Sequence, residues 1–287
     1  MKKLILGVAM SLFLAGGAHA TSIGYAKSTI NRLYTFKLGD TTQQGQAIRL
    51  SKAKLQAMKG KTIDFAEFVT GSKNTTDGNI HTFITTSLGG TPLVEGSVKL
   101  EKALTWCKWT LDQPYTITGE EENLYIGYTA DIKTSYKLLI ADGSYDIEGY
   151  NFAFQDGKWV DTYGMNKGSA QIRVNVEGVA DYPDVIMASN SFDSYFKVGG
   201  SYDFSTRFIN AGTTAITSFD AQVSVNDKTV TQHFGNLNIK AKDNYSFKIT
   251  GVDATEEGEK ALKVTINNIS GTDADTDLSD NSFTDHI

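Results

Sequence analysis

Residues 169–178 read "SAQIRVNVEG", and their alternation of apolar and polar side chains indicates the fold class. The apolar positions are Ala170, Ile172, Val174 and Val176. A period of two residues is that of a half-buried β-strand, and it recurs in "YDFSTRF" (202–208) and "SFDAQVSVND" (218–227). Glycine-containing turns such as "TDGN" and "QDGK" separate the runs. Many short alternating strands predict an all-β protein built from sandwiches, not from parallel α/β sheets.

Helical periodicity is almost absent outside one segment. The best helix candidate is "LSKAKLQAMKG" (50–60), in which Ser51 can cap the first turn and Gly60 can end the last.

The strand pattern on either side of residue 178 predicts a domain boundary. One strand finishes near Glu177, Pro183 interrupts the chain, and a new series of strands starts near Val185. We therefore expect a first domain over residues 21–178 and a second over residues 179–287. The second is about a hundred residues long, the usual size of an immunoglobulin-like sandwich.

The first twenty residues have the pattern of a cleavable export signal. Lys2 and Lys3 precede an apolar run, and Ala18-His19-Ala20 is a small-x-small cleavage site. The run is too short to read as a membrane anchor. We expect residues 1–20 to be removed and the mature chain to lie in the periplasm, on the outer-membrane surface or outside the cell, with no membrane-spanning segment.

Charge and cysteine content exclude some classes of partner and bond. The chain has 27 basic and 33 acidic residues, a formal net charge of −6, with no lysine or arginine cluster. This argues against nucleic acid or an anionic membrane as the main partner. Cys107 is the single cysteine, so no internal disulfide can form and stability must come from packing.

Residues 109–128 carry a resemblance to a known family. Trp109, Leu111, Pro114 and Ile117 precede an acidic turn, and "LYIGY" (124–128) follows it. This pattern resembles the cleaved-adhesin modules of gingipain- and haemagglutinin-type Bacteroidetes surface proteins. The resemblance implies a jelly-roll-like β-sandwich with an adhesive role. Most of the matching residues read as strand scaffold, and Gly127 indicates a bulge or a close backbone approach.

The second domain resembles a different family. Asn210-Ala211-Gly212 follows an early strand, and a turn over residues 277–281 precedes the last one. Both features resemble bacterial cell-adhesion-related immunoglobulin-like domains. The pairing of the two domains resembles the front part of certain Bacteroidetes outer-membrane proteins, in which a further domain often follows.

An acidic segment near the C-terminus raises the question of a metal. Asp273, Asp275 and Asp277 alternate as calcium ligands can. An EF-hand needs glycine at its sixth position and glutamate at its twelfth, and here these are Leu278 and Thr284. An EF-hand is therefore excluded. We favour a solvated acidic hairpin, and a looser calcium site is the alternative.

Three aromatic residues are the candidates for ligand binding: Trp106, Tyr115 and Trp159. Trp106 and Trp109 are three residues apart, so a regular strand places them on opposite faces. Trp109 belongs to the family-like scaffold, and an outward Trp106 could stack on a sugar ring or anchor a protein. The alternative is that Trp106 only covers a sheet edge.

No arrangement for catalysis is evident. Ser51-x-x-Lys54 lacks the companion elements of serine β-lactamases, and Cys107 has few histidines that could serve as its base. The sequence thus favours a non-catalytic adhesion or binding protein, without cofactor, that recognises a host or cell-surface protein or glycan. The alternative is an accessory region of a larger secreted peptidase or outer-membrane protein whose functional domain lies beyond residue 287.

Overall fold

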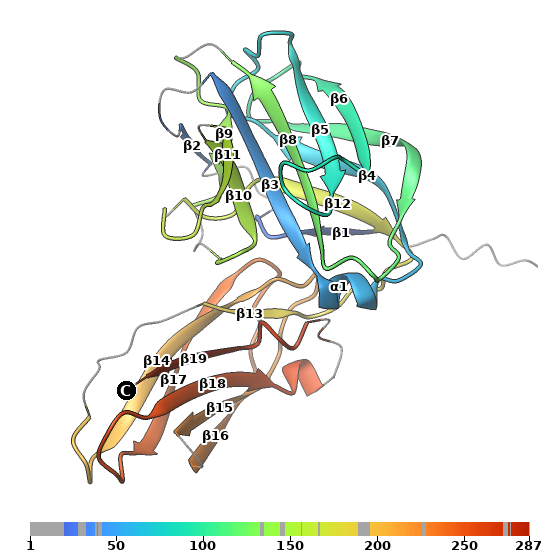
Figure 1. The fold of residues 1–287 in the computed structure, drawn as a ribbon. Coiled ribbons are helices and arrows are strands. Elements are labelled where there is room, and N and C mark those ends of the chain that lie inside the picture. Colours follow the sequence, from blue (N-terminus) through green and yellow to red (C-terminus); the bar gives the residue numbers. More distant parts are fainter. Residues whose placement is uncertain are drawn as a thin grey trace, which may run out of the picture.

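In a computed structural model the chain is built almost wholly from antiparallel strands, which confirms the all-β fold class (Figure 1). The structure describes residues 20–27, 33–37, 39, 42–132, 135–143, 147–155, 157–165, 167–188, 196–225, 228–271, 275 and 277–286. The proposed export signal, residues 1–20, lies outside this part of the chain except for Ala20. Within the described part, no helix has the length and apolar character needed to cross a membrane.

The N-terminal half is a sandwich of two sheets. One sheet has four strands in the order β1 (Ala20–Gly24), β12 (Ile172–Glu177), β4 (Thr62–Val69), β7 (Trp106–Thr116). The other has six, in the order β11 (Lys158–Asp161), β10 (Asn151–Gln155), β3 (Gln43–Ser51), β8 (Asn123–Asp131), β5 (Asn79–Thr85), β6 (Val94–Lys99). A separate ribbon pairs β2 (Tyr34–Phe36) with β9 (Leu139–Ala141).

The alternation in residues 169–178 places β12 as predicted. Ile172, Val174 and Val176 are buried in the core, and Arg173 and Asn175 between them are only half-buried. Ile48, Ile126 and Phe68 come from other strands of the same core. Gly127 sits in regular register between β3 and β5, so the close backbone approach, not a bulge, accounts for it.

The predicted helix forms as α1 (Lys52–Ala57), which starts two residues later and ends three residues earlier than the predicted segment 50–60. Ser51 is its N-cap and accepts a hydrogen bond from the Lys54 amide, which satisfies one free donor of the first turn. Gly60 follows at φ +77°, a conformation that favours glycine. The helix closes one end of the sandwich and buries Lys54 and Leu55.

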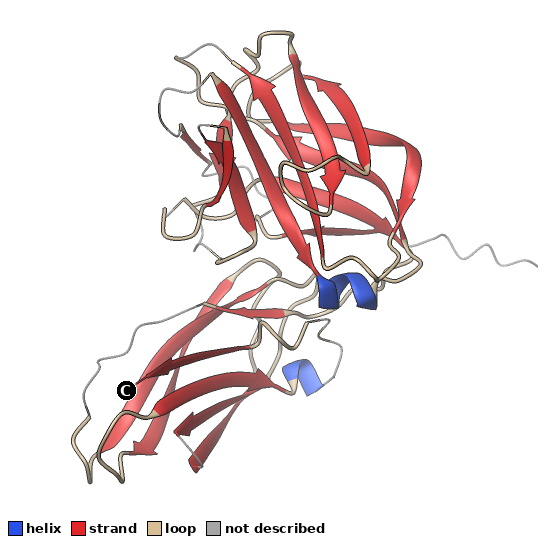
Figure 2. Ribbon diagram, viewed as in Figure 1, coloured by secondary structure: helices blue, strands red, loops and turns tan. Residues whose placement is uncertain are grey.

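The C-terminal half is a second sandwich. One sheet has the order β13 (Val185–Met187), β14 (Ser201–Asn210), β17 (Asn244–Asp253), and the other β16 (Lys228–Phe234), β15 (Phe219–Val225), β18 (Ala261–Asn267), β19 (Ser282–His286). A short 3₁₀ turn, η1 (Ile269–Gly271), follows β18. Phe204, Phe208 and Phe219 belong to a core of its own. Figure 2 shows the two sandwiches end to end, with α1 and β13 near their junction.

Asn210 of the Asn-Ala-Gly motif, the last residue of β14, links two loops of the second sandwich. Its buried side-chain amide donates to the carbonyls of Thr214 (2.8 Å) and Ile239 (2.9 Å). Gly212 packs so tightly that a Cβ atom there would lie 2.4 Å from the Tyr182 carbonyl oxygen. The motif is therefore a structural device that lets the linker before β13 lie against the second sandwich.

Candidate functional site

The two neighbouring tryptophans of β7 lie on opposite faces of the four-stranded sheet. Trp109 is 5% exposed and belongs to the core, where Gly96 leaves room for its ring. Trp106 is half-buried on the outer face, and the Arg173 guanidinium carbon lies 4.1 Å from its ring centroid. A cation over a tryptophan face is an attractive contact. Trp106 is thus covered in part by the protein's own cation.

Tyr115, the second candidate, takes part in a structural contact with the acidic turn. Its hydroxyl donates to Glu121 Oε1 (2.7 Å), which also accepts from the Thr118 amide (2.9 Å). Burial opposes ionisation of Glu121, but these hydrogen bonds outweigh it and lower the Glu121 pKa to about 2. Burial and the neighbouring carboxylate raise the Tyr115 pKa above its ordinary value.

Trp159 lies on the other sheet, among four more aromatic side chains. We call this group the aromatic face: Phe83, Tyr125, Phe152, Phe154 and Trp159. All five are half-buried and project from the outer side of the six-stranded sheet, because their strand neighbours point into the core. The structure therefore does not bring Trp106, Tyr115 and Trp159 together: two belong to β7 and one to β11.

The rings of the aromatic face meet edge to face. Trp159 lies 5.6 Å from Phe83 and 5.3 Å from Phe154 between ring centroids, and Tyr125 lies 5.5 Å from Phe152. Interplanar angles of 74°, 68° and 76° fit the preferred T-shaped geometry. Such contacts hold the rings in fixed orientations on the sheet.

Two glycines form the floor under these rings. A Cβ atom at Gly45 would lie 3.2 Å from the Trp159 ring, and one at Gly127 would lie 2.7 Å from Phe83 Cζ. The missing side chains let the rings settle against the backbone of β3 and β8.

Polar side chains border the aromatic face on the β5–β6 side. An open depression of about 480 Å³ is lined by residues that include Phe83, exposed His81 and exposed Glu95. His81 Nε2 lies 3.0 Å from Asp77 Oδ2. Aromatic surface next to exposed hydrogen-bonding groups can receive a ligand that has both an apolar face and hydroxyl or amide groups.

The described residues of the acidic segment, Asp275 and Asp277, lie at the junction of the two sandwiches. Asp275 Oδ2 accepts from the Val185 amide (3.2 Å) and from Asn281 Nδ2 (3.0 Å). Asp277 is 1% exposed and accepts hydrogen bonds from Ser51 Oγ and Ser279. Among the described residues, no group of three or more His, Cys, Asp or Glu side chains is arranged to hold a metal ion. Asp273 lies outside these residues, so the calcium site stays a prediction.

A buried ion pair joins the same junction. Lys54 Nζ binds Asp184 Oδ2, with both side chains at most 2% exposed. Burial raises the pKa of Asp184, the attraction of Lys54 opposes this shift, and the repulsion of Asp275 adds to it. The resulting pKa of Asp184 is about 7. Tyr150 donates to Asp280, whose pKa is raised to about 8, mainly by burial. Together with the contact between Ser51 and Asp277, these contacts dock the end of the first sandwich that carries α1 on the linker before β13 and on the turn before β19.

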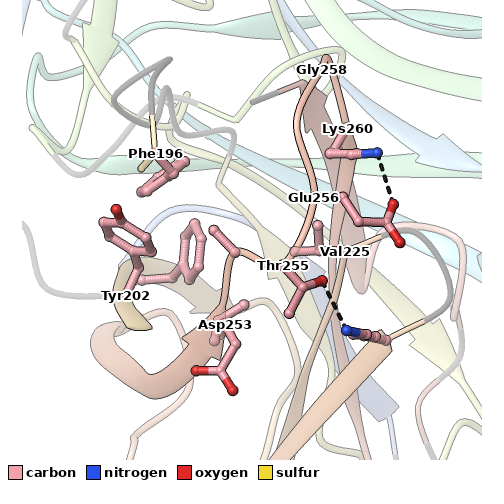
Figure 3. A pocket seen from close by; sticks show the side chains of 12 residues that line it. Phe196, Tyr202, Val225, Asp253, Thr255, Glu256, Gly258 and Lys260 are labelled. Atoms are coloured by element: carbon pink, nitrogen blue, oxygen red, sulfur yellow. Dashed lines mark hydrogen bonds and ion pairs between the residues drawn. The ribbon is translucent and has the colours of Figure 1, made fainter. Parts of the chain in front are cut away.

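A separate pocket lies at the far end of the second sandwich, with a volume of about 240 Å³ (Figure 3). Phe196, Tyr202 and Phe204 pack against one another along one wall. At its mouth Lys228 Nζ donates to Thr255 Oγ1 (2.8 Å), and Lys260 pairs with Glu256 (3.0 Å). Both lysines are thus engaged by neighbouring side chains, and the walls combine apolar and polar contacts.

The two possible nucleophiles that the sequence suggested, Cys107 and Ser51, make structural contacts. The half-buried Cys107 thiol donates to the Phe68 carbonyl (3.2 Å), and burial raises its pKa to about 11. Ser51 caps α1 and binds Asp277. The three described histidines each pair with a carboxylate: His81 with Asp77, His233 with Asp220, and His286 with Glu259.

Sequence reasoning named one member of the aromatic face, Trp159, and missed the others. Phe83, Phe152 and Phe154 do alternate with core residues along their strands, and that alternation was the available signal. Their convergence was not readable, because β5, β8, β10 and β11 become neighbours only through the strand order of the six-stranded sheet.

Comparisons with known proteins leave the family open. No family model matches the chain, and no curated protein matches it in sequence. The resemblance to cleaved-adhesin modules therefore stays a prediction.

Solved structures resemble the chain only distantly. The CARDB domain of a Pyrococcus furiosus protein, solved in complex with di-metal ions, has a TM-score of 0.27 and 17% identity over 37% of this chain and 87% of its own. A Bacteroides uniformis β-glucuronidase has a TM-score of 0.27 and 11% identity, over 94% of this chain and 31% of the enzyme. Red sea bream transglutaminase has a TM-score of 0.26 and 8% identity, over 89% and 30%. The chain thus spans about a third of the length of the two enzymes, and likenesses this weak carry no argument about function.

Proposed function

We propose that this protein is a non-catalytic binding module that recognises a glycan through the aromatic face. The observation that carries the proposal is the group of five half-buried aromatic side chains on the outer side of one sheet. Large aromatic residues usually fill cores, and a contiguous group at the surface is typical of an interaction site.

A glycan fits this face better than an apolar ligand does. The C–H face of a sugar ring stacks on aromatic side chains, while its hydroxyl groups need hydrogen-bonding partners at the border. His81 and Glu95 are exposed beside Phe83 and can supply them. The depression is open to solvent, so an extended chain of sugar residues can lie across it.

The test begins with the full mature chain on an array of glycans and proteins, followed by calorimetry with the best glycan. We expect Trp159→Ala to weaken binding about tenfold or more, the equivalent of about 1.4 kcal/mol, because an aromatic anchor is lost. Phe83→Leu keeps apolar volume, removes a ring, and should weaken binding severalfold without unfolding the chain.

Tyr34→Ala is the matched control. Tyr34 is 55% exposed but lies on the β2–β9 ribbon, so its loss should leave affinity unchanged. Wild-type affinity in both Trp159→Ala and Phe83→Leu would show that the aromatic face is not the binding site. Binding to proteins alone on the array would show that the glycan class is wrong.

A further inference from the structure

A groove of about 440 Å³ runs between the two sandwiches, on the outer side of the four-stranded sheet. We call it the interdomain groove. Gly24 of β1, Arg173 of β12 and Trp106 line it from the first sandwich, and Gly212 and residues 240–243 line it from the second. Clefts of this size between domains are common sites for small ligands.

The charge of the groove is opposite to that of the whole protein. Its lining has four basic side chains (Lys27, Arg173, Lys240 and Lys242) and two acidic ones (Asp181 and Asp243), in a chain of net charge −6. Lys27 pairs with Asp243 across the groove (2.9 Å), and Arg173 Nε pairs with Glu67 (2.7 Å). Within the described part of the chain, neither Lys240 nor Lys242 forms an ion pair. Lys240 and Lys242 are therefore available to pair with an anion in the groove.

Lys242 is held in an unfavourable position for a charged group. It is half-buried, and its Nζ donates to the Ala211 carbonyl. Burial, and then the repulsion of Lys54, lower its pKa to about 7, and Asp184 opposes the shift only in part. An anion bound beside Lys242 would stabilise the charged form and restore its proton.

Trp106 and Arg173 add the features of a sugar-acid site. The guanidinium lies 4.1 Å from the Trp106 ring centroid and uses its Nε for Glu67, so its other N–H groups remain as donors. A uronic acid has an apolar ring face for an aromatic side chain and a carboxylate for cations. We propose that the interdomain groove binds an acidic saccharide, with the sugar ring against Trp106 and the carboxylate between Lys240 and Lys242. This site is separate from the aromatic face and does not depend on it.

Calorimetry with trigalacturonate at pH 6 tests the proposal, and its fully methyl-esterified form is the neutral comparison. We expect the acid to bind at least tenfold more tightly than the ester. Lys240→Ala, at an exposed loop position, should weaken binding of the acid severalfold, and Lys242→Met about tenfold. Lys263→Ala, an exposed lysine of β18, and Trp159→Ala should bind as the wild type does.

The pH profile separates a charge role of Lys242 from a structural one. Affinity for trigalacturonate should fall as the pH rises from 6 to 9, because burial and the neighbouring Lys54 lower the pKa of the unbound Lys242 to about 7, and the nearby Asp184 becomes anionic over the same range. Lys242→Arg should keep binding and show a flatter profile, since arginine stays charged.

Three outcomes would overturn the proposal. The first is equal affinity for the acid and its ester. The second is wild-type affinity in both Lys240→Ala and Lys242→Met. The third is tighter binding of a hexaglutamate peptide than of trigalacturonate, which would make the ligand an acidic peptide. Trp159→Ala should lose glycan binding at the aromatic face and keep trigalacturonate binding. This result would show that the two sites are separate.

Discussion

The two sheets of the first sandwich both carry aromatic side chains on their outer faces, but these rings contact different kinds of neighbouring side chain. On the four-stranded sheet, Lys108 Nζ lies 3.5 Å from the Phe65 ring centroid, and Arg173 lies over Trp106. On the six-stranded sheet, the rings of the aromatic face meet mainly one another.

This difference separates aromatic rings that a cation partly covers from rings that no cation covers. A cation over a ring occupies the face that it covers, so a ligand can approach that ring only from its uncovered part. Edge-to-face packing leaves other parts of the rings free for a ligand. Strand alternation is the same on both sheets, so exposure of an aromatic residue alone does not identify a binding face.

The largest effect should come from the side chain that faces inward. Trp109→Ala removes a core ring that is 5% exposed, and it should lower the free energy of unfolding by about 3–5 kcal/mol through a cavity. Trp159→Ala should cost only about 1–2 kcal/mol, the worth of its two ring contacts. Urea denaturation of both variants measures this, and equal losses would contradict the assignment of Trp159 to the surface.

A smaller effect should follow from filling the floor of the aromatic face. In Gly127→Ala the new Cβ would lie 2.7 Å from Phe83 Cζ and 2.5 Å from the Gln46 carbonyl oxygen. Overpacking of this kind costs about 1–3 kcal/mol, and it should also displace Phe83 and weaken glycan binding. Gly157→Ala is the control, because no atom lies within 4 Å of its added Cβ. It should keep wild-type binding, although its φ of +76° also costs stability.

Tyr115→Phe should separate stability from binding on the four-stranded sheet. The variant loses the hydrogen bond to Glu121, so the free energy of unfolding at pH 7 should fall by about 1 kcal/mol with glycan binding unchanged. The pKa of Glu121 is lowered to about 2 in the folded state, so its stabilisation is present above the unfolded pKa, near 4.3. That stabilisation is lost as the pH falls toward 2.

Melting curves of the wild type and Tyr115→Phe from pH 2 to pH 7 follow this change. The two proteins should converge in stability at the acid end. A gap that stays constant over the whole range would show that the hydroxyl does not act through Glu121.

The smallest effect should come from removing a cation that covers a ring. Lys108→Met keeps the apolar stem over Phe65 and removes the charge, so stability should fall by about 0.5–1 kcal/mol. Thermal unfolding with and without 0.5 M salt checks it. A gain in glycan binding by this variant would sharpen the comparison, because it would show that the cation had blocked the ring.

Several features of the fold were predictable because they depend on neighbours in sequence. Ile172, Val174 and Val176 alternate with polar residues, which indicated a half-buried strand whatever its partners. Ser51 and Gly60 marked the limits of the best helix candidate through local capping chemistry. The spacing of Trp106 and Trp109 put them on opposite faces, since side-chain direction alternates along any regular strand.

The candidate sites depended on residues far apart in the chain. Phe83 and Trp159 touch because β5, β8, β3, β10 and β11 are laid in that order. Lys54 and Asp184 form a buried pair across 130 positions, and nothing in either local segment indicates the other. Asp275 and Asp277 alternate as calcium ligands can, and a solvated acidic hairpin was the favoured interpretation; in the structure their oxygens accept hydrogen bonds from Val185, Asn281, Ser51 and Ser279.

The sequence by itself determined that this protein is all-β, where the α-helix of its described part lies, and which strand positions are apolar. Those properties follow from backbone periodicity and capping, which act over a few residues. Only the tertiary structure decided which outward aromatics form one face, which are covered by cations, and which charges meet between the sandwiches. Strand order and domain docking bring distant residues within contact distance, and the resulting burial and charge determine what each side chain can do.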